Sequence, residues 1–103
     1  MAISNFKDLQ AFITKVLTDN GDWGLLKNSP HGAFWNDLSY ADFISPDQSV
    51  PNTGVTPILI PKNSAGSNII IALSNGSMPM GGTAFTPAQI AEISGWIDTN
   101  CPQ

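Results

Sequence analysis

The sequence predicts a small all-α domain of three to four helices joined by long loops. Two observations support this fold class: apolar residues near the start recur with the period of a helix, and several helix-start signals coincide near the end. The chain has 103 residues, 42% of them hydrophobic, and 17 are Gly or Pro, so residues 1–103 fit one loop-rich domain with a modest core.

The first helix is predicted from about Asn5 to Thr18, with Ser4 or Asn5 as its cap. Its apolar positions fall on one helical stripe, which we expect to face the core. These positions are Phe6, Leu9, Phe12, Ile13, Val16 and Leu17. Asn20-Gly21 then ends the helix.

A short helix is predicted from about Tyr40 to Ile44, capped by Ser39 and ending before Pro46. Turn-forming residues between Pro46 and Pro57 indicate a surface loop there.

A further helix of about nine residues is predicted to start at Asn63 or Ser64 and to be closed by Asn75-Gly76. The apolar run 68–73 is also compatible with a buried strand, because β-branched residues favour sheets. The preceding cap and the following Gly favour the helix.

The last helix has the clearest start. Thr86 is the expected N-cap, Pro87 occupies the first helical position, and Gln89 completes a capping box, while Phe85 and Ile90 can form a hydrophobic staple. The helix is expected to run through Asp98.

Composition argues against two classes of partner. The chain has eight acidic residues, four lysines and no arginine. A nucleic-acid partner is therefore not expected, because phosphate contacts require a basic surface. No apolar run approaches the roughly 20 residues that a membrane-spanning helix needs, so no membrane partner is expected.

The chain start shows neither a basic stretch nor an apolar stretch of a secretory signal. The expected location is the cytoplasm, or an exported compartment if the chain is one domain of a longer protein. Cys101 is the only cysteine and is interpreted as an incidental terminal thiol, with intermolecular pairing or metal ligation as alternatives.

The C-terminal part carries a family resemblance. Residues 58–73, the loop Met78-Pro79-Met80-Gly81-Gly82 and the segment 85–98 resemble the C-terminal half of small class I cytochrome c domains over about 45 residues. In that family a helix precedes an MPxGG-type loop that presents a Met to haem iron, and a final helix closes the fold.

The resemblance implies that the first and last helices cross. We therefore expect Ile93, Trp96 and Ile97 to meet Phe12, Ile13 and Val16, with Gly95 allowing close approach.

The haem-attachment motif CxxCH of that family is missing. His31 is followed by Gly32 as in the family, but Lys27 and Pro30 stand where the cysteines would be, so no thioether attachment can form. Residues 21–26 are an insertion relative to the family. The chain therefore resembles a haem-less relative of cytochrome c.

An aromatic and apolar block stands where the family has its haem-contacting loop. We interpret it as refilling the haem space, because protein interiors do not tolerate a large void. A surviving ligand pocket and an exposed patch for a partner chain are the alternatives. The block comprises Trp23, Leu25, Leu26, Phe34, Trp35, Leu38, Tyr40 and Phe43.

Two functions follow. The first is a non-catalytic binding or interaction module whose partner is another protein chain. The second is an electron-transfer or metal-carrying protein in which His31 with Met78 or Met80 binds non-covalent haem or copper, since imidazole and thioether are suitable ligands for both. The alternative reading of His31 is a hydrogen-bonded packing residue. No nucleophile elbow, phosphate loop or zinc-binding His pair is present, so an enzyme is not expected.

Overall fold

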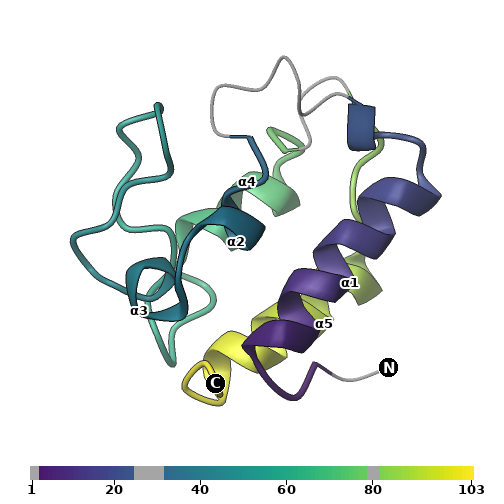
Figure 1. The fold of residues 1–103 in the computed structure, drawn as a ribbon. Helices are drawn as coiled ribbons and strands as arrows, with labels where there is room; N and C mark the ends of the chain where they lie inside the picture. Colours follow the sequence, from purple (N-terminus) through teal and green to yellow (C-terminus); the bar gives the residue numbers. More distant parts are fainter. Residues whose placement is uncertain (1–2, 25–31, 79–81) are drawn as a thin grey trace.

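A computed structural model describes residues 3–24, 32–78 and 82–103 of the chain. Within them the protein is all-α, as predicted, with five helices and no strand (Figure 1). The helices are α1 (Phe6–Asp19), α2 (Phe34–Asp37), α3 (Tyr40–Phe43), α4 (Asn68–Ser74) and α5 (Pro87–Asp98). The prediction of three to four helices was therefore too low, because α2 is a single turn without a side-chain cap.

Helix α1 confirms the first prediction to within one residue at each end. The side chain of Asn5 caps it by accepting a hydrogen bond from the Asp8 N–H at 2.7 Å. The predicted stripe faces the core, with Phe12 only partly buried. Its fully buried members are Phe6, Leu9, Ile13, Val16 and Leu17.

Helix α4 is a helix and not a strand, but it begins later than predicted. Asn63 and Ser64 do not cap it: the Asn63 side chain accepts from the Gly66 N–H, and Ser64 bonds to the Asp98 carboxylate. The cap position belongs to Ser67, whose hydroxyl donates to the Asn63 carbonyl at 2.7 Å. Two turn-forming side chains upstream were thus mistaken for the helix start.

Helix α5 confirms the strongest local prediction. The Thr86 side chain accepts from the Gln89 N–H at 3.1 Å, and the Gln89 side chain accepts from the Thr86 N–H at 2.8 Å, so both halves of the capping box are present. Pro87 lies in the first turn, as expected.

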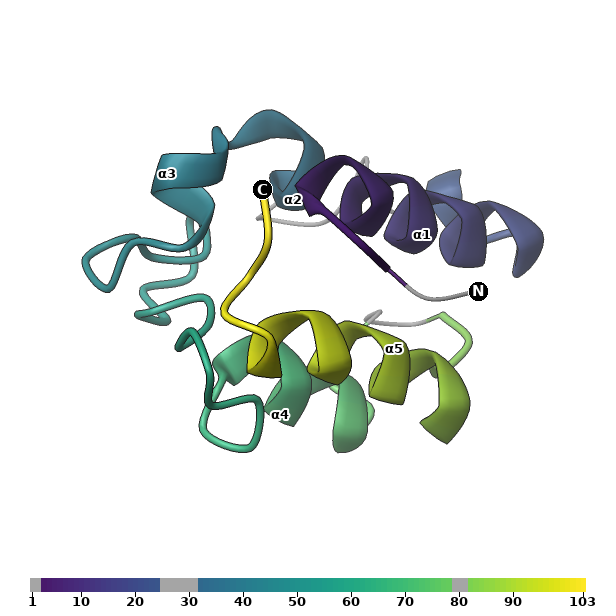
Figure 2. The ribbon, with the colours of Figure 1, turned by 90° about the horizontal axis from the view of Figure 1, so that it is seen from below.

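All five helices contribute to one apolar core. Figure 2 shows α1 on one side of it and α4 with α5 on the other, while α2 and α3 close one end. Val50, from the predicted surface loop between Pro46 and Pro57, is also buried, so this loop contacts the core at one residue.

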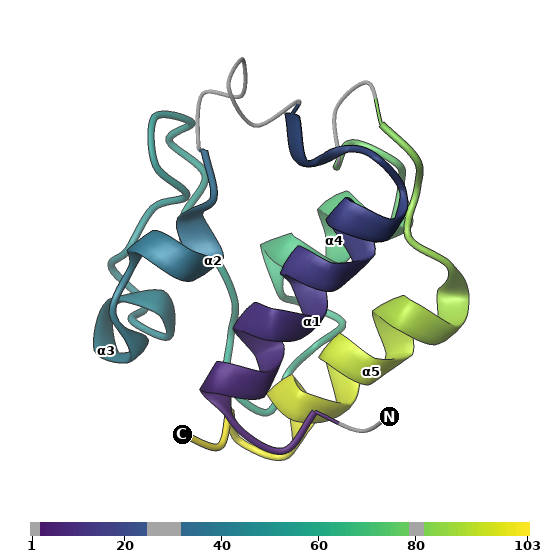
Figure 3. The ribbon, with the colours of Figure 1, turned by 45° about the vertical axis from the view of Figure 1, so that its right-hand side comes forward.

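Helices α1 and α5, which the family resemblance implied to cross, meet at one end of the core. In three views α1 and α5 run in roughly opposite directions (Figures 1, 2 and 3). The start of one meets the end of the other, since the ring of Phe6 stacks on Trp96 with centroids 6.2 Å apart.

The expected close approach at Gly95 is wrong. Gly95 is exposed, and a Cβ added there would meet no atom within 4 Å. The absent side chain therefore creates no contact between helices.

Replacing Gly95 with Ala is expected to stabilise the protein by up to about 1 kcal/mol, because Gly in the middle of a helix costs conformational entropy. Urea denaturation of the two proteins measures this gain. A loss of stability would show that a neighbour does require Gly at this position.

Candidate functional site

Of the predicted haem or copper ligands, Met78 lies within the described part of the chain, whereas His31 and Met80 lie outside it. Leu25 and Leu26 of the predicted aromatic block also lie outside the described residues. Met78 follows α4 and is partly buried against the core. Its N–H donates to the Ala72 carbonyl at 3.2 Å, which holds its backbone against the end of the helix.

A side chain that the sequence analysis missed joins two distant segments. Asp22 follows α1 and is only 9% exposed, and its Oδ2 accepts from the Thr83 N–H at 2.7 Å. The Asp22 N–H itself donates to the Leu17 carbonyl at 2.8 Å. Asp22 precedes the segment that carries His31 in the sequence, and Thr83 follows the segment that carries Met80, so this bond joins described residues on either side of the two segments. No motif in the sequence signals this contact.

Replacing Asp22 with Ala is expected to lower the free energy of unfolding by about 2 kcal/mol, because it removes a charged acceptor from a largely buried site. Hydrogen exchange at the Thr83 amide should speed up at the same time. Asp22→Asn is the matched control, since its amide oxygen can still accept that bond. Equal hydrogen-exchange rates at the Thr83 amide in Asp22→Ala and Asp22→Asn would contradict a hydrogen bond between the Thr83 N–H and the side chain of residue 22.

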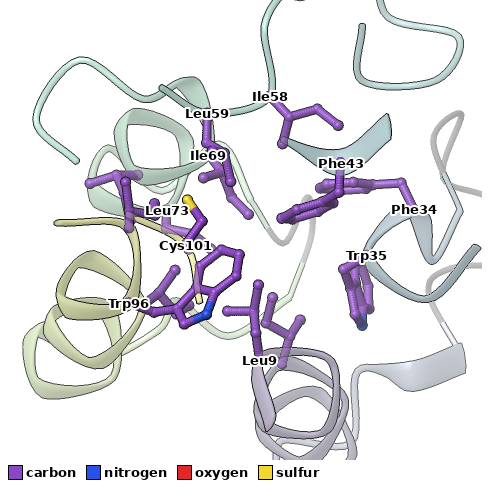
Figure 4. Close-up of a cluster of buried hydrophobic side chains, with 14 of the residues drawn as sticks. Leu9, Phe34, Trp35, Phe43, Ile58, Leu59, Ile69, Leu73, Trp96 and Cys101 are labelled. Carbon is purple, nitrogen blue, oxygen red and sulfur yellow. The ribbon is translucent and has the colours of Figure 1, made fainter. Parts of the chain in front are cut away.

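Among the described residues of the predicted aromatic block, three rings are buried and Trp23 is exposed. Phe34, Trp35 and Phe43 are at most 3% exposed. Figure 4 shows Phe34 and Phe43 with their rings stacked, at 6.2 Å between centroids, and Trp96 faces Phe43 at 6.4 Å. Trp23 remains 41% exposed at the rim. The buried rings therefore belong to the core.

Trp23 contacts this core through the ring of Trp35. The planes of the Trp23 and Trp35 rings meet at an angle of 75°, and the ring centroids lie 6.4 Å apart. The Trp35 Nε1–H donates to the Thr14 hydroxyl at 3.2 Å, so the supporting ring is itself fixed to α1.

Cys101 is a core residue, which corrects its interpretation as an incidental terminal thiol. Its side chain is 0% exposed. The Tyr40 hydroxyl donates to its carbonyl at 2.5 Å, and its N–H donates to the Trp96 carbonyl at 3.1 Å. Nearby, the Trp96 Nε1–H donates to the Pro102 carbonyl at 2.9 Å, so the C-terminal segment is held over the core.

Burial raises the pKa of the Cys101 thiol from 9.0 to about 11. The unfolded chain loses this proton first, so the folded state binds more protons between these values. Stability is then fully present below pH 9.0 and falls by about 2 kcal/mol as the pH rises through about 11. Denaturation of the parent and of Cys101→Ala across this range measures the effect. A parallel decline in both proteins would contradict it.

The described residues form a surface depression but no cluster of metal-binding side chains. No three His, Cys, Asp or Glu side chains among them are grouped so as to hold a metal ion. An open depression lies between the end of α4 and the start of α5. It is lined by Ser74, Pro87, Ile90 and Ala91.

Comparison with known proteins identifies no family for this chain. No protein-family model, characterised protein or solved structure matches the chain. Across the described helices, none is both long and apolar enough to span a membrane.

Proposed function

We propose that this chain is a non-catalytic binding module with a cytochrome c-like architecture, whose haem space is refilled and whose partner is another protein chain. The observation that carries the proposal is the burial of Phe34 and Phe43, at 1% and 0% exposure, in the part of the chain that would contact haem. Their rings contact each other and further aromatic side chains, so they fill volume that a cofactor would otherwise need.

Trp23 is the residue that we assign to the partner contact. Tryptophan is enriched among the few residues that dominate binding energy, because it buries a large rigid surface. The ring of Trp23 already contacts that of Trp35, so less rotational freedom is lost when a partner covers it.

The partner contact is tested with two comparably exposed apolar residues. Trp23 is 41% and Ile71 is 46% exposed. A partner captured from the source cell should be lost with Trp23→Ala and retained with Ile71→Ala, measured by isothermal titration with the purified partner. Equal loss in both variants, or in neither, contradicts the assignment to Trp23.

A second candidate function is electron transfer or metal carriage through His31 with Met78 or Met80. What supports it is the bond of 2.7 Å between the Thr83 N–H and Asp22, because it joins the flanks of the two segments that carry these residues. Imidazole and thioether side chains suit haem iron and copper.

One measurement separates the two functions. The visible spectrum of the purified protein is recorded before and after addition of haemin, and copper is quantified in the same sample. A colourless, copper-free protein that does not respond to haemin is the expected result for the binding module. A Soret band that shifts in His31→Ala and Met78→Ala, or stoichiometric copper lost in them, favours the second function. Gly95→Ala is the control that leaves every candidate ligand in place.

A further inference from the structure

The chain contains two Asn-Gly pairs in the described structure, and they are held differently. Asn20-Gly21 follows α1, and Asn75-Gly76 follows α4. Both glycines have positive φ, 74° and 81°. We propose that Asn75-Gly76 is a site of spontaneous deamidation and that Asn20-Gly21 is protected by its hydrogen bonds.

The reaction needs only water. The Gly76 amide nitrogen, after losing its proton to solvent base, attacks Cγ of Asn75, and the bond between Cγ and Nδ2 breaks as ammonia leaves. The resulting cyclic imide takes up one water at either carbonyl, giving aspartate or isoaspartate. No redox partner is involved.

The surroundings of Asn75 favour this attack. Its Oδ1 accepts from the Ser77 N–H at 2.9 Å and from the Ser77 hydroxyl at 2.6 Å. These two donors turn the side-chain amide toward the backbone that follows. They also stabilise the negative charge that Oδ1 acquires when the nitrogen attacks, as donors do in an oxyanion hole.

The attacking nitrogen is also available. Asn75, Gly76 and Ser77 are exposed, and no hydrogen bond among the described residues engages the Gly76 N–H. The next backbone contact is the bond of 3.2 Å from Met78 to Ala72. Few contacts therefore oppose the rotation that brings the nitrogen to Cγ.

The backbone of the Asn20-Gly21 pair is held by hydrogen bonds that oppose the same rotation. The Gly21 N–H donates to the Thr18 carbonyl at 3.0 Å, and the Asp22 N–H donates to the Leu17 carbonyl at 2.8 Å. Attack at Asn20 requires both bonds to break. At typical hydrogen-bond strengths this slows the reaction there on the order of tenfold.

Deamidation at Asn75 would alter the Met78 segment. A new carboxylate would stand at the C-terminal end of α4, where the helix dipole disfavours negative charge. An isoaspartyl link would lengthen the backbone just before Ser77 and Met78, and so weaken the bond between Met78 and Ala72.

The test is incubation of the native protein at mildly alkaline pH, with peptide mass mapping of both sites over time. Asn75 should convert about tenfold faster than Asn20. In denaturant the two rates should become similar. A native ratio equal to the denatured ratio, or faster conversion at Asn20, overturns the proposal.

The variant Ser77→Ala provides a second test of the proposal. Ser77 is exposed, so its replacement is expected to leave the fold intact. Loss of the hydroxyl donor should slow conversion at Asn75 roughly fivefold and leave Asn20 unchanged. An unchanged or faster rate at Asn75 would overturn the assigned role of the Ser77 hydroxyl.

Discussion

Replacing Trp96 with Ala is expected to lower the free energy of unfolding by about 3–5 kcal/mol. Trp96 is 1% exposed, and its ring stacks on Phe6 from α1 and contacts Phe43 from α3. It also donates to the Pro102 carbonyl, so one side chain joins both terminal helices and the C-terminal segment. A domain of this size has only about 5–15 kcal/mol of stability, so the loss would be large.

Trp23→Ala is the matched control, because it removes the same side chain from a position that is 41% exposed. Its edge contact with Trp35 is worth about 1 kcal/mol. Urea denaturation followed by far-UV circular dichroism measures both variants. Similar small losses for the two tryptophans would contradict the packing of Trp96.

The elements predicted well from the sequence are those whose signals lie within a few residues. The side chains of Thr86 and Gln89 each accept a hydrogen bond from the other residue's backbone N–H within one turn, so the start of α5 could be predicted from the sequence. The same holds for Asn5 at α1 and Ser39 at α3, whose side chains cap the helices that follow them.

The errors arose where distant contacts decide the local structure. Ser64 has the properties of a cap, but its hydroxyl donates to Asp98 across the fold at 2.9 Å. Cys101 lies near the end of the chain, yet Tyr40 helps to hold it in the core. No spacing rule reports such contacts, because they depend on which segments meet after folding.

The candidate site was predicted only in part. The burial of Phe34, Trp35 and Phe43 followed from the composition of the block, since large apolar side chains are mostly found in the core. The bond between Asp22 and Thr83 joins residues 61 positions apart, and neither residue carries a motif that signals it.

Replacing Phe43 with Ala is the second large prediction, and it tests whether the aromatic side chains fill the interior. Phe43 is 0% exposed, and its ring centroid lies 5.3 Å from that of Phe6 and 6.2 Å from that of Phe34. Truncation should cost about 3–5 kcal/mol, because an apolar void remains where the ring stood. Thermal and urea denaturation measure this loss.

The void should also bind a small apolar molecule. Enclosed apolar cavities stay dry and accept ligands such as benzene, so benzene should raise the melting temperature of Phe43→Ala and leave that of the parent unchanged. Tyr40→Phe is the control, since it removes the hydroxyl bond to Cys101 and leaves the ring in place. If benzene stabilised the parent protein as strongly as Phe43→Ala, the interior would contain an open pocket, and the proposal of a refilled haem space would be wrong.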